Sequence, residues 1–135
     1  MSAASPINVL IIEDERPVRE SFRYYLEDLN YLVLEAEDGE QGLQLFKQHQ
    51  PDIIITDLRM PNVSGHTVLG ELAKLAPDTP LIVVSGTGKI SDTVEALHLG
   101  AWDYLLKPIS DLTMLEHAIS KSLDRARLLK ENREH

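Results

Sequence analysis

Short apolar runs alternate with amphipathic segments along the length of this chain. The runs predict five strands, at residues 8–13, 32–36, 52–56, 80–85 and 102–106. The third and fourth runs are continuously apolar, which is typical of central strands that are covered on both faces. Strands that alternate with helical segments predict βα units around a parallel sheet. The pattern therefore indicates the α/β class.

The segments after these strands have the spacing and the breakers of helices. The first helix is expected to follow Pro17, a residue tolerated in a first helical turn, and Pro51 and Pro77 follow the second and third helices. Gly100 is a suitable stop for the fourth. The apolar positions of the five helices are, in order, Val18, Phe22, Leu26 and Leu29; Leu43 and Phe46; Val68, Leu69, Leu72 and Leu75; Ile90, Val94 and Leu97; and Leu112, Leu115, Ile119, Ala126 and Leu129.

Length and composition narrow the possible functions. The 135 residues suffice for one domain with a single core, and 43% hydrophobic with 26% charged residues is typical of a soluble globular protein. A net charge of -9 argues against direct nucleic-acid binding, and the absence of cysteine excludes disulfides and thiolate metal sites. No apolar stretch is long enough to span a membrane, and the first residues lack the pattern of a signal peptide. We therefore expect a cytoplasmic protein.

Charged and hydroxyl side chains follow several of the predicted strands at the point where each strand ends. Glu13 and Asp14 lie at the end of the first strand, Asp57 follows the third, Ser85 ends the fourth, and Lys107 follows the fifth. Because the carboxyl ends of parallel strands meet at one edge of the sheet, where such folds bind ligands, we expect these side chains to lie together. Like charges at one edge are costly unless a cation or a proton joins them.

The residue types at this edge favour phosphoryl transfer. Glu13, Asp14 and Asp57 offer only oxygen ligands, which points to Mg²⁺, or Mn²⁺ in its place. Lys107 adds a point charge that could pair with Asp57 or with a phosphoryl group. A carboxylate nucleophile beside a metal and a lysine could form an acyl phosphate.

These residues, taken together, resemble a known family. From residue 7 to residue 124 the chain resembles the receiver domain of bacterial two-component response regulators. The resemblance rests on the order and spacing of Glu13-Asp14, Asp57, Met60-Pro61 with Gly65, Ser85, Tyr104 and Lys107-Pro108. It implies a flavodoxin-like (βα)5 fold, with a doubly wound parallel sheet in the strand order 2-1-3-4-5.

The resemblance also implies a role for each acid. Asp57 would accept a phosphoryl group from a histidine kinase or a phosphotransfer protein. Asp14, Asp57 and the backbone carbonyl of Arg59 would hold Mg²⁺, and Glu13 would contribute directly or through water. Because the domain would itself be the acceptor and would lose the phosphate again, no turnover of a separate substrate is expected.

The remaining members of the set would transmit the signal. Ser85 would hydrogen-bond the phosphoryl group, and Tyr104 would turn inward on activation. Lys107-Pro108 would contain the cis peptide bond common in the family. The face formed by the fourth helix, the fifth strand and the fifth helix would act on an output domain or a partner protein. The chain is similar to receivers fused to phosphatase-like modules, some of which regulate sigma-factor availability.

The last helix leaves two interpretations open. It begins near Ser110, and its apolar spacing continues past the length needed to cover a sheet. It is either a core helix with a solvated end or an amphipathic helix that extends into a homodimer or a coiled-coil linker. We therefore divide the chain into a tail at residues 1–6, a receiver domain at 7–124, and an extended helix or linker towards an output domain at 125–135.

Three other functions stay open at this point. A metal-dependent phosphohydrolase of the haloacid dehalogenase type also uses an aspartyl phosphate, but it has a second acid where this chain has Arg59. A receiver-like module that acts without phosphorylation usually lacks the aspartate or the lysine, whereas Asp57 and Lys107 are both present. A flavin-binding flavodoxin-type protein needs a phosphate cradle in the first loop, which is acidic here.

Overall fold

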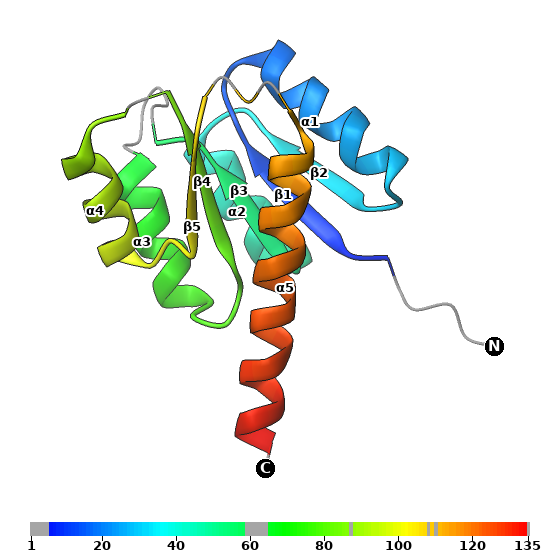
Figure 1. Ribbon diagram of the computed structural model, residues 1–135, viewed down its shortest axis with the longest axis vertical. Helices are drawn as coiled ribbons and strands as arrows, with labels where there is room; N and C mark the ends of the chain where they lie inside the picture. The colour runs from blue at the N-terminus through cyan, green and yellow to red at the C-terminus, as the bar shows by residue number, and fades with distance from the viewer. Residues whose placement is uncertain (1–5, 59–64, 87, 108, 110, 135) are drawn as a thin grey trace.

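The described part of the chain forms one parallel sheet of five strands in the order β2-β1-β3-β4-β5. The computed structural model describes residues 6–58, 65–86, 88–107, 109 and 111–134. Strands and helices alternate along the sequence (Figure 1). The elements are β1 (Asn8–Ile12), α1 (Arg16–Asp28), β2 (Leu32–Ala36), α2 (Gly39–His49), β3 (Ile53–Thr56), α3 (Gly65–Leu75), β4 (Leu81–Ser85), α4 (Ile90–Leu99), β5 (Asp103–Leu106) and α5 (Thr113–Glu134).

Both faces of the sheet are covered by helices, as the continuous apolar runs predicted. On one face, Leu10 and Ile54 of the central strands pack with side chains of α2, α3 and α4. On the other face, Ile11 and Ile55 pack with side chains of α1 and α5. The expected α/β fold with a doubly wound sheet and the strand order 2-1-3-4-5 is confirmed.

The strand register brings the carboxyl ends of the strands to one level. Ile12 at the end of β1 lies opposite Ala36 of β2 and Thr56 of β3. At the other side of the sheet, Ser85 at the end of β4 lies opposite Leu106 of β5. The residues that directly follow these strands therefore share the upper edge of the sheet in Figure 1.

The ends of several elements differ slightly from the expected ones. The third, fourth and fifth strands each begin one residue later than predicted, and the first helix begins at Arg16, with Pro17 inside its first turn. The fifth helix begins at Thr113, after Asp111, whose side chain accepts hydrogen bonds from the Thr113 amide and hydroxyl at 3.0 and 2.7 Å. Asp111 therefore caps the N-terminus of α5.

Helix α4 does not direct its apolar positions at the sheet. Ile90, Val94 and Leu97 are 80%, 58% and 48% exposed, whereas Ala96 is buried. Leu75, at the end of α3, is also exposed. The apolar spacing by itself is misleading here, because α4 packs between α3 and the edge strand β5 through its small residue.

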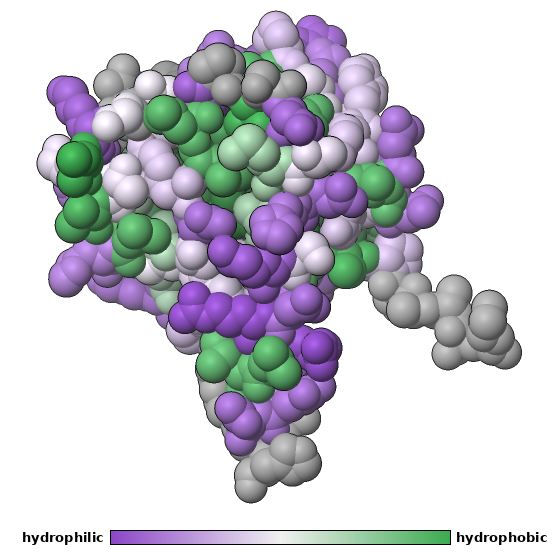
Figure 2. All heavy atoms as spheres, in the orientation of Figure 1, coloured by the Kyte–Doolittle hydropathy of each residue, from purple (hydrophilic) through white to green (hydrophobic). Residues whose placement is uncertain are grey.

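Helix α5 continues beyond the lower edge of the sheet (Figure 1). Ser122, which interrupts the apolar spacing in the sequence, lies buried against the body of the domain. Leu128 and Leu129 are exposed on the projecting end, where Figure 2 shows an apolar patch. Among the described residues, no helix is long and apolar enough to cross a membrane.

At Gly65, the first residue of α3, the backbone lies close to the segment that follows β3. Its amide donates a hydrogen bond of 3.2 Å to the carbonyl of Leu58, the residue after Asp57. A Cβ atom at this position would overlap backbone atoms of Leu58. Because backbone atoms cannot rotate away as a side chain does, Gly65 is required where α3 returns to the end of β3.

Gly65→Ala should lower the free energy of unfolding by about 1–3 kcal/mol, because the added methyl group overpacks a rigid contact. Urea unfolding followed by circular dichroism measures the change. Gly70→Ala in the same helix is the matched control, since its nearest neighbour would be Leu99 Cδ2 at 3.9 Å. That control should be neutral or stabilising by up to about 1 kcal/mol, as expected for alanine in a helix. Equal stability of the two variants would contradict the prediction.

Candidate functional site

Backbone hydrogen bonds carry the site residues one step past the ends of the strands. The Glu13 amide donates to Ala36 O at 3.0 Å, and the Asp57 amide donates to Ile12 O at 3.1 Å. The Lys107 amide donates to the carbonyl of Ser85 at 2.8 Å. These bonds extend the sheet ladder, so rigid backbone rather than loop presents the three charged side chains.

Lys107 lies at the centre of the site. Its ammonium nitrogen Nζ is 2.9 Å from Asp57 Oδ2 and 2.5 Å from Glu13 Oε1. A longer approach of 3.5 Å joins it to Glu15 Oε1. The side chains of Glu13 and Asp57 are almost fully buried, and that of Lys107 is 13% exposed. Charges removed from water to this degree are tolerated only when they are paired.

The pKa of Glu13 is strongly perturbed. Burial raises the pKa of its carboxyl from 4.5 to about 7, although hydrogen bonds from Lys107 and from the Glu15 amide oppose the shift. For Lys107, burial alone would lower the pKa, but the hydrogen bonds to Glu13 and Asp57 outweigh burial and raise it. The ammonium therefore stays charged, and the raised pKa lets the Glu13 carboxyl take up a proton near neutral pH.

Four carboxylates form one cluster at this edge. Ligand oxygens of Glu13, Asp14, Glu15 and Asp57 lie within 4.8 Å of one another. Glu13 and Asp57 are buried beside the lysine, whereas Asp14 and Glu15 are exposed. Four acids around one lysine leave an excess of negative charge, and an all-oxygen donor set that is open to solvent on one side suits Mg²⁺, which retains several waters. The residues present fit this ion.

Glu15 was not among the predicted site residues. It belongs to the cluster because its amide donates a 3.1 Å hydrogen bond to Glu13 Oε2, which turns the chain back towards the edge. The third consecutive acid in Glu13-Asp14-Glu15 was the available signal. Arg59, whose carbonyl was predicted to hold the metal, lies outside the described residues, as does Pro108 of the expected cis peptide bond.

The two predicted signalling residues lie at different depths. Ser85 is fully buried at the end of β4, at the same edge as Asp57. Tyr104 lies opposite Val83, below that edge, and is partly buried against the core on the α4 side of the sheet. The structure thus brings Glu13, Asp14, Asp57, Ser85 and Lys107 together, and their functional roles stay predictions.

One protein family matches this arrangement over most of the chain. A family model described as the response regulator receiver domain matches residues 9–120. The chain belongs to the response regulator receiver family. As a receiver domain it is part of a two-component system, and receiver domains generally bind Mg²⁺ at an acidic pocket.

Curated relatives of the receiver domain are longer proteins. The probable transcriptional regulator ycf27 of Guillardia theta is 40% identical over 102 residues, which cover 76% of this chain and 40% of that protein. The response regulator MprA of Mycobacterium sp. (strain KMS) is 36% identical over 105 residues, covering 78% of this chain and 46% of that protein. This chain thus matches less than half the length of each of these two relatives.

Solved structures share the fold of this receiver domain. The CheY-like receiver domain protein of Methanospirillum hungatei JF-1 matches with a TM-score of 0.87 at 27% identity, covering 91% of this chain and 98% of that one. A receiver domain protein from Clostridium thermocellum matches with a TM-score of 0.85 at 32% identity, with the same coverage.

In protein free of divalent cations, Glu13→Gln should change the pH dependence of the free energy of unfolding. The carboxyl of Glu13 has a pKa of about 7 in the folded protein, whereas the pKa of a glutamate carboxyl in an unfolded chain is 4.5. Between pH 4.5 and about pH 7 the folded state binds more protons than the unfolded state. The carboxyl therefore contributes stability that is lost as the pH rises through this window. The variant should therefore gain roughly 1–3 kcal/mol relative to the wild type across the window. Urea unfolding in EDTA measures this.

Glu20→Gln is a control, because the effect of Glu20 on the free energy of unfolding depends on pH with the opposite sign. The hydrogen bond from Arg16 lowers the pKa of Glu20, so this carboxylate contributes stability that is lost as the pH falls. If unfolding free energies of wild type and Glu13→Gln ran parallel across the window, the raised pKa would be refuted.

Proposed function

We propose that this receiver domain is a phosphorylation switch in which Asp57 accepts a phosphoryl group from the phosphohistidine of a histidine kinase or phosphotransfer protein. The observation that carries the proposal is the Asp57 carboxylate at the sheet edge, 2.9 Å from Lys107 and within the four-carboxylate cluster. Such a carboxylate is a nucleophile that already has one neutralising group, the Lys107 ammonium, beside it.

The transfer would proceed by attack of an Asp57 carboxylate oxygen on phosphorus. The oxygen–phosphorus bond forms, the phosphorus–nitrogen bond breaks, and its electron pair returns to the donor imidazole. Lys107 now pairs with the carboxylate and would move its ammonium to a phosphoryl oxygen. Mg²⁺ held by Glu13, Asp14, Asp57 and the carbonyl of Arg59 would neutralise charge on the phosphoryl oxygens. The domain turns over no separate substrate in this scheme.

The signal would pass from the edge to the face formed by α4, β5 and α5. Recruitment of the Ser85 hydroxyl to the phosphoryl group would shift the end of β4, and Tyr104 would turn into the space released. Exposed apolar side chains on this face, namely those of Ile90, Val94 and Leu106, support its use as a contact surface.

The output partner would lie outside these residues. The relatives named as transcriptional regulators support an output that acts on transcription. With a net charge of -9, this domain is unsuited to contact DNA itself. A phosphatase-like output module and a homodimer through the last helix remain the alternatives that the sequence suggested, and the cytoplasm is the expected location.

A small phosphodonor such as acetyl phosphate, with Mg²⁺, should add one phosphate to the wild-type protein, and Asp57→Asn should abolish the addition. Asp52→Asn is the matched control, because Asp52 precedes the same strand at its opposite end and accepts a 2.8 Å hydrogen bond from the Asn8 amide. This control should be labelled like the wild type. Intact-protein mass spectrometry reads the result. Labelling that persists in Asp57→Asn would refute the phosphoacceptor assignment.

A further inference from the structure

Helix α1 buries an arginine behind the acidic site. Arg19 is 8% exposed, which is unusual for arginine. It lies on the side of α1 that also carries the buried Phe22 and Leu26. A buried guanidinium requires hydrogen-bond partners that replace water, so its contacts show what it holds in place.

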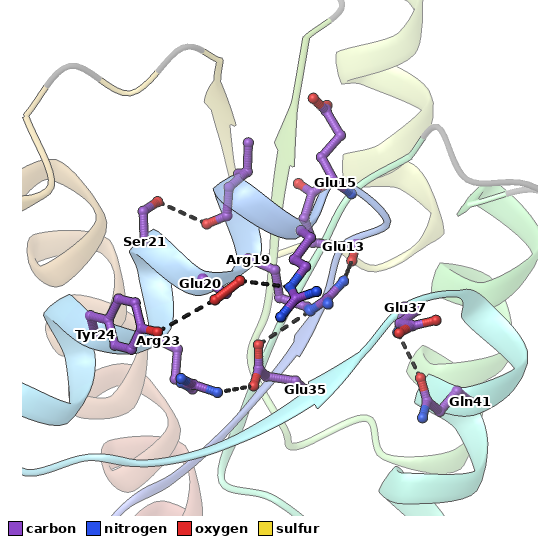
Figure 3. Close-up of polar contacts among 12 residues, drawn as sticks. Glu13, Glu15, Arg19, Glu20, Ser21, Arg23, Tyr24, Glu35, Glu37 and Gln41 are labelled. Atoms are coloured by element: carbon purple, nitrogen blue, oxygen red, sulfur yellow. Dashed lines mark hydrogen bonds and ion pairs between the residues drawn. The ribbon is translucent and has the colours of Figure 1, made fainter.

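Arg19 joins Glu13, the residue after β1, to Glu35 of β2 through two of its nitrogens (Figure 3). Its Nη1 donates a buried hydrogen bond of 2.9 Å to the backbone carbonyl of Glu13. Its Nε donates to Oε1 of Glu35 on β2 at 3.2 Å. The other oxygen of Glu35 accepts a 2.6 Å hydrogen bond from Nη1 of Arg23, one helical turn further along α1. Glu35 therefore anchors both arginines, but Arg19 alone of this pair is hydrogen-bonded to Glu13 among the described contacts.

The contact with Glu13 immobilises one peptide group of the site. The Glu13 amide is held by Ala36 O, and its carboxylate is held by Lys107 and the Glu15 amide. Arg19 holds the remaining polar group, the carbonyl, which belongs to the peptide between Glu13 and Asp14. The orientation of that peptide determines where the exposed Asp14 carboxylate projects.

We propose that Arg19 is a positioning residue for the acidic site, and that with Glu35 it fixes the Glu13–Asp14 peptide so that the carboxylates converge on a divalent cation. The inference rests on the proposed function, because it assigns the cation to this cluster. Partners that orient metal ligands typically change metal affinity by about 10- to 100-fold when they are removed.

Arg19→Met leaves an unbranched apolar side chain and removes both hydrogen bonds. The test is the affinity of the folded protein for Mn²⁺, measured by electron paramagnetic resonance of the free ion, under conditions in which circular dichroism shows each variant folded. Arg19→Met should weaken Mn²⁺ binding about tenfold or more. Amide NMR signals of Glu13, Asp14 and Glu15 should also shift in metal-free protein.

Arg23→Met is the matched control. It removes the same residue type from the same helix and the same partner, Glu35, without touching Glu13. It should lower the free energy of unfolding and leave the Mn²⁺ affinity within about twofold of the wild type. Equal loss of affinity in both arginine variants would overturn the proposal, because it would show a general effect of charge or stability.

Arg19→Lys tests the same point if Arg19→Met does not fold. The lysine retains the buried positive charge, but a single ammonium cannot donate in the two fixed directions of a guanidinium. We expect it to weaken Mn²⁺ binding measurably. A wild-type affinity in this variant would show that charge alone matters and would overturn the positioning role.

Two further variants separate the inference from the function on which it rests. Asp14→Asn and Asp57→Asn should each reduce Mn²⁺ binding strongly if the cluster is the cation site. A wild type that binds no Mn²⁺ would refute the proposed cation site and the inference with it. Binding that requires Asp14 and Asp57 but is unchanged in Arg19→Met would overturn the inference alone.

Discussion

A partly buried ammonium group surrounded by carboxylates is the constraint on which the rest of this molecule depends. Lys107 lies within 2.9 Å of Asp57 and 2.5 Å of Glu13, and both acids are nearly excluded from water. Either acid without the lysine would be an uncompensated buried charge, which is strongly destabilising. Burial raises the pKa of Glu13 to about 7 even though the hydrogen bond from Lys107 opposes the shift, so the lysine only partly offsets the cost of burying this acid. The excess of negative charge that the four acids leave at this edge favours the binding of a cation.

The sheet provides a rigid backbone for this cluster of charged side chains. Ladder hydrogen bonds continue one residue past β1, β3 and β5, and they hold Glu13, Asp57 and Lys107 at fixed spacing. Apolar packing on both faces of the central strands supports that edge. Arg19 of helix α1 donates a further hydrogen bond to the carbonyl of Glu13, in the peptide that leads to Asp14. The charged groups therefore stay close together, because hydrogen bonds fix the backbone segments that carry them.

Helices α1 and α4, which lie on opposite faces of the sheet, differ in how firmly they are held. Helix α1 contributes the buried side chains of Phe22 and Leu26, together with the arginine contacts to β1 and β2. In α4, all of which the structure describes, Ala96 is the single buried residue. Elements with little buried apolar surface shift at low cost in free energy. This contrast supports the proposed switch, in which α1 preserves the site and α4 transmits a change at Ser85.

The sequence by itself determined the architecture and the main members of the site. Continuous apolar runs and helical spacing between them predicted the parallel sheet, because burial on two faces requires that pattern. Acids and a lysine placed directly after strands could be assigned to one edge, because parallel strands end there together. Asp57, Glu13, Asp14, Ser85 and Lys107 were all found in this way.

Tertiary structure decided the contacts that depend on how each helix is rotated on the sheet. The pairing of Arg19 with Glu35 spans 16 positions of the chain, and no local spacing rule predicts it. The apolar positions of α4 face solvent because neighbouring elements, and not the spacing, set its orientation. Local pattern determines which element forms, whereas the partner of each side chain is set only when the elements pack together.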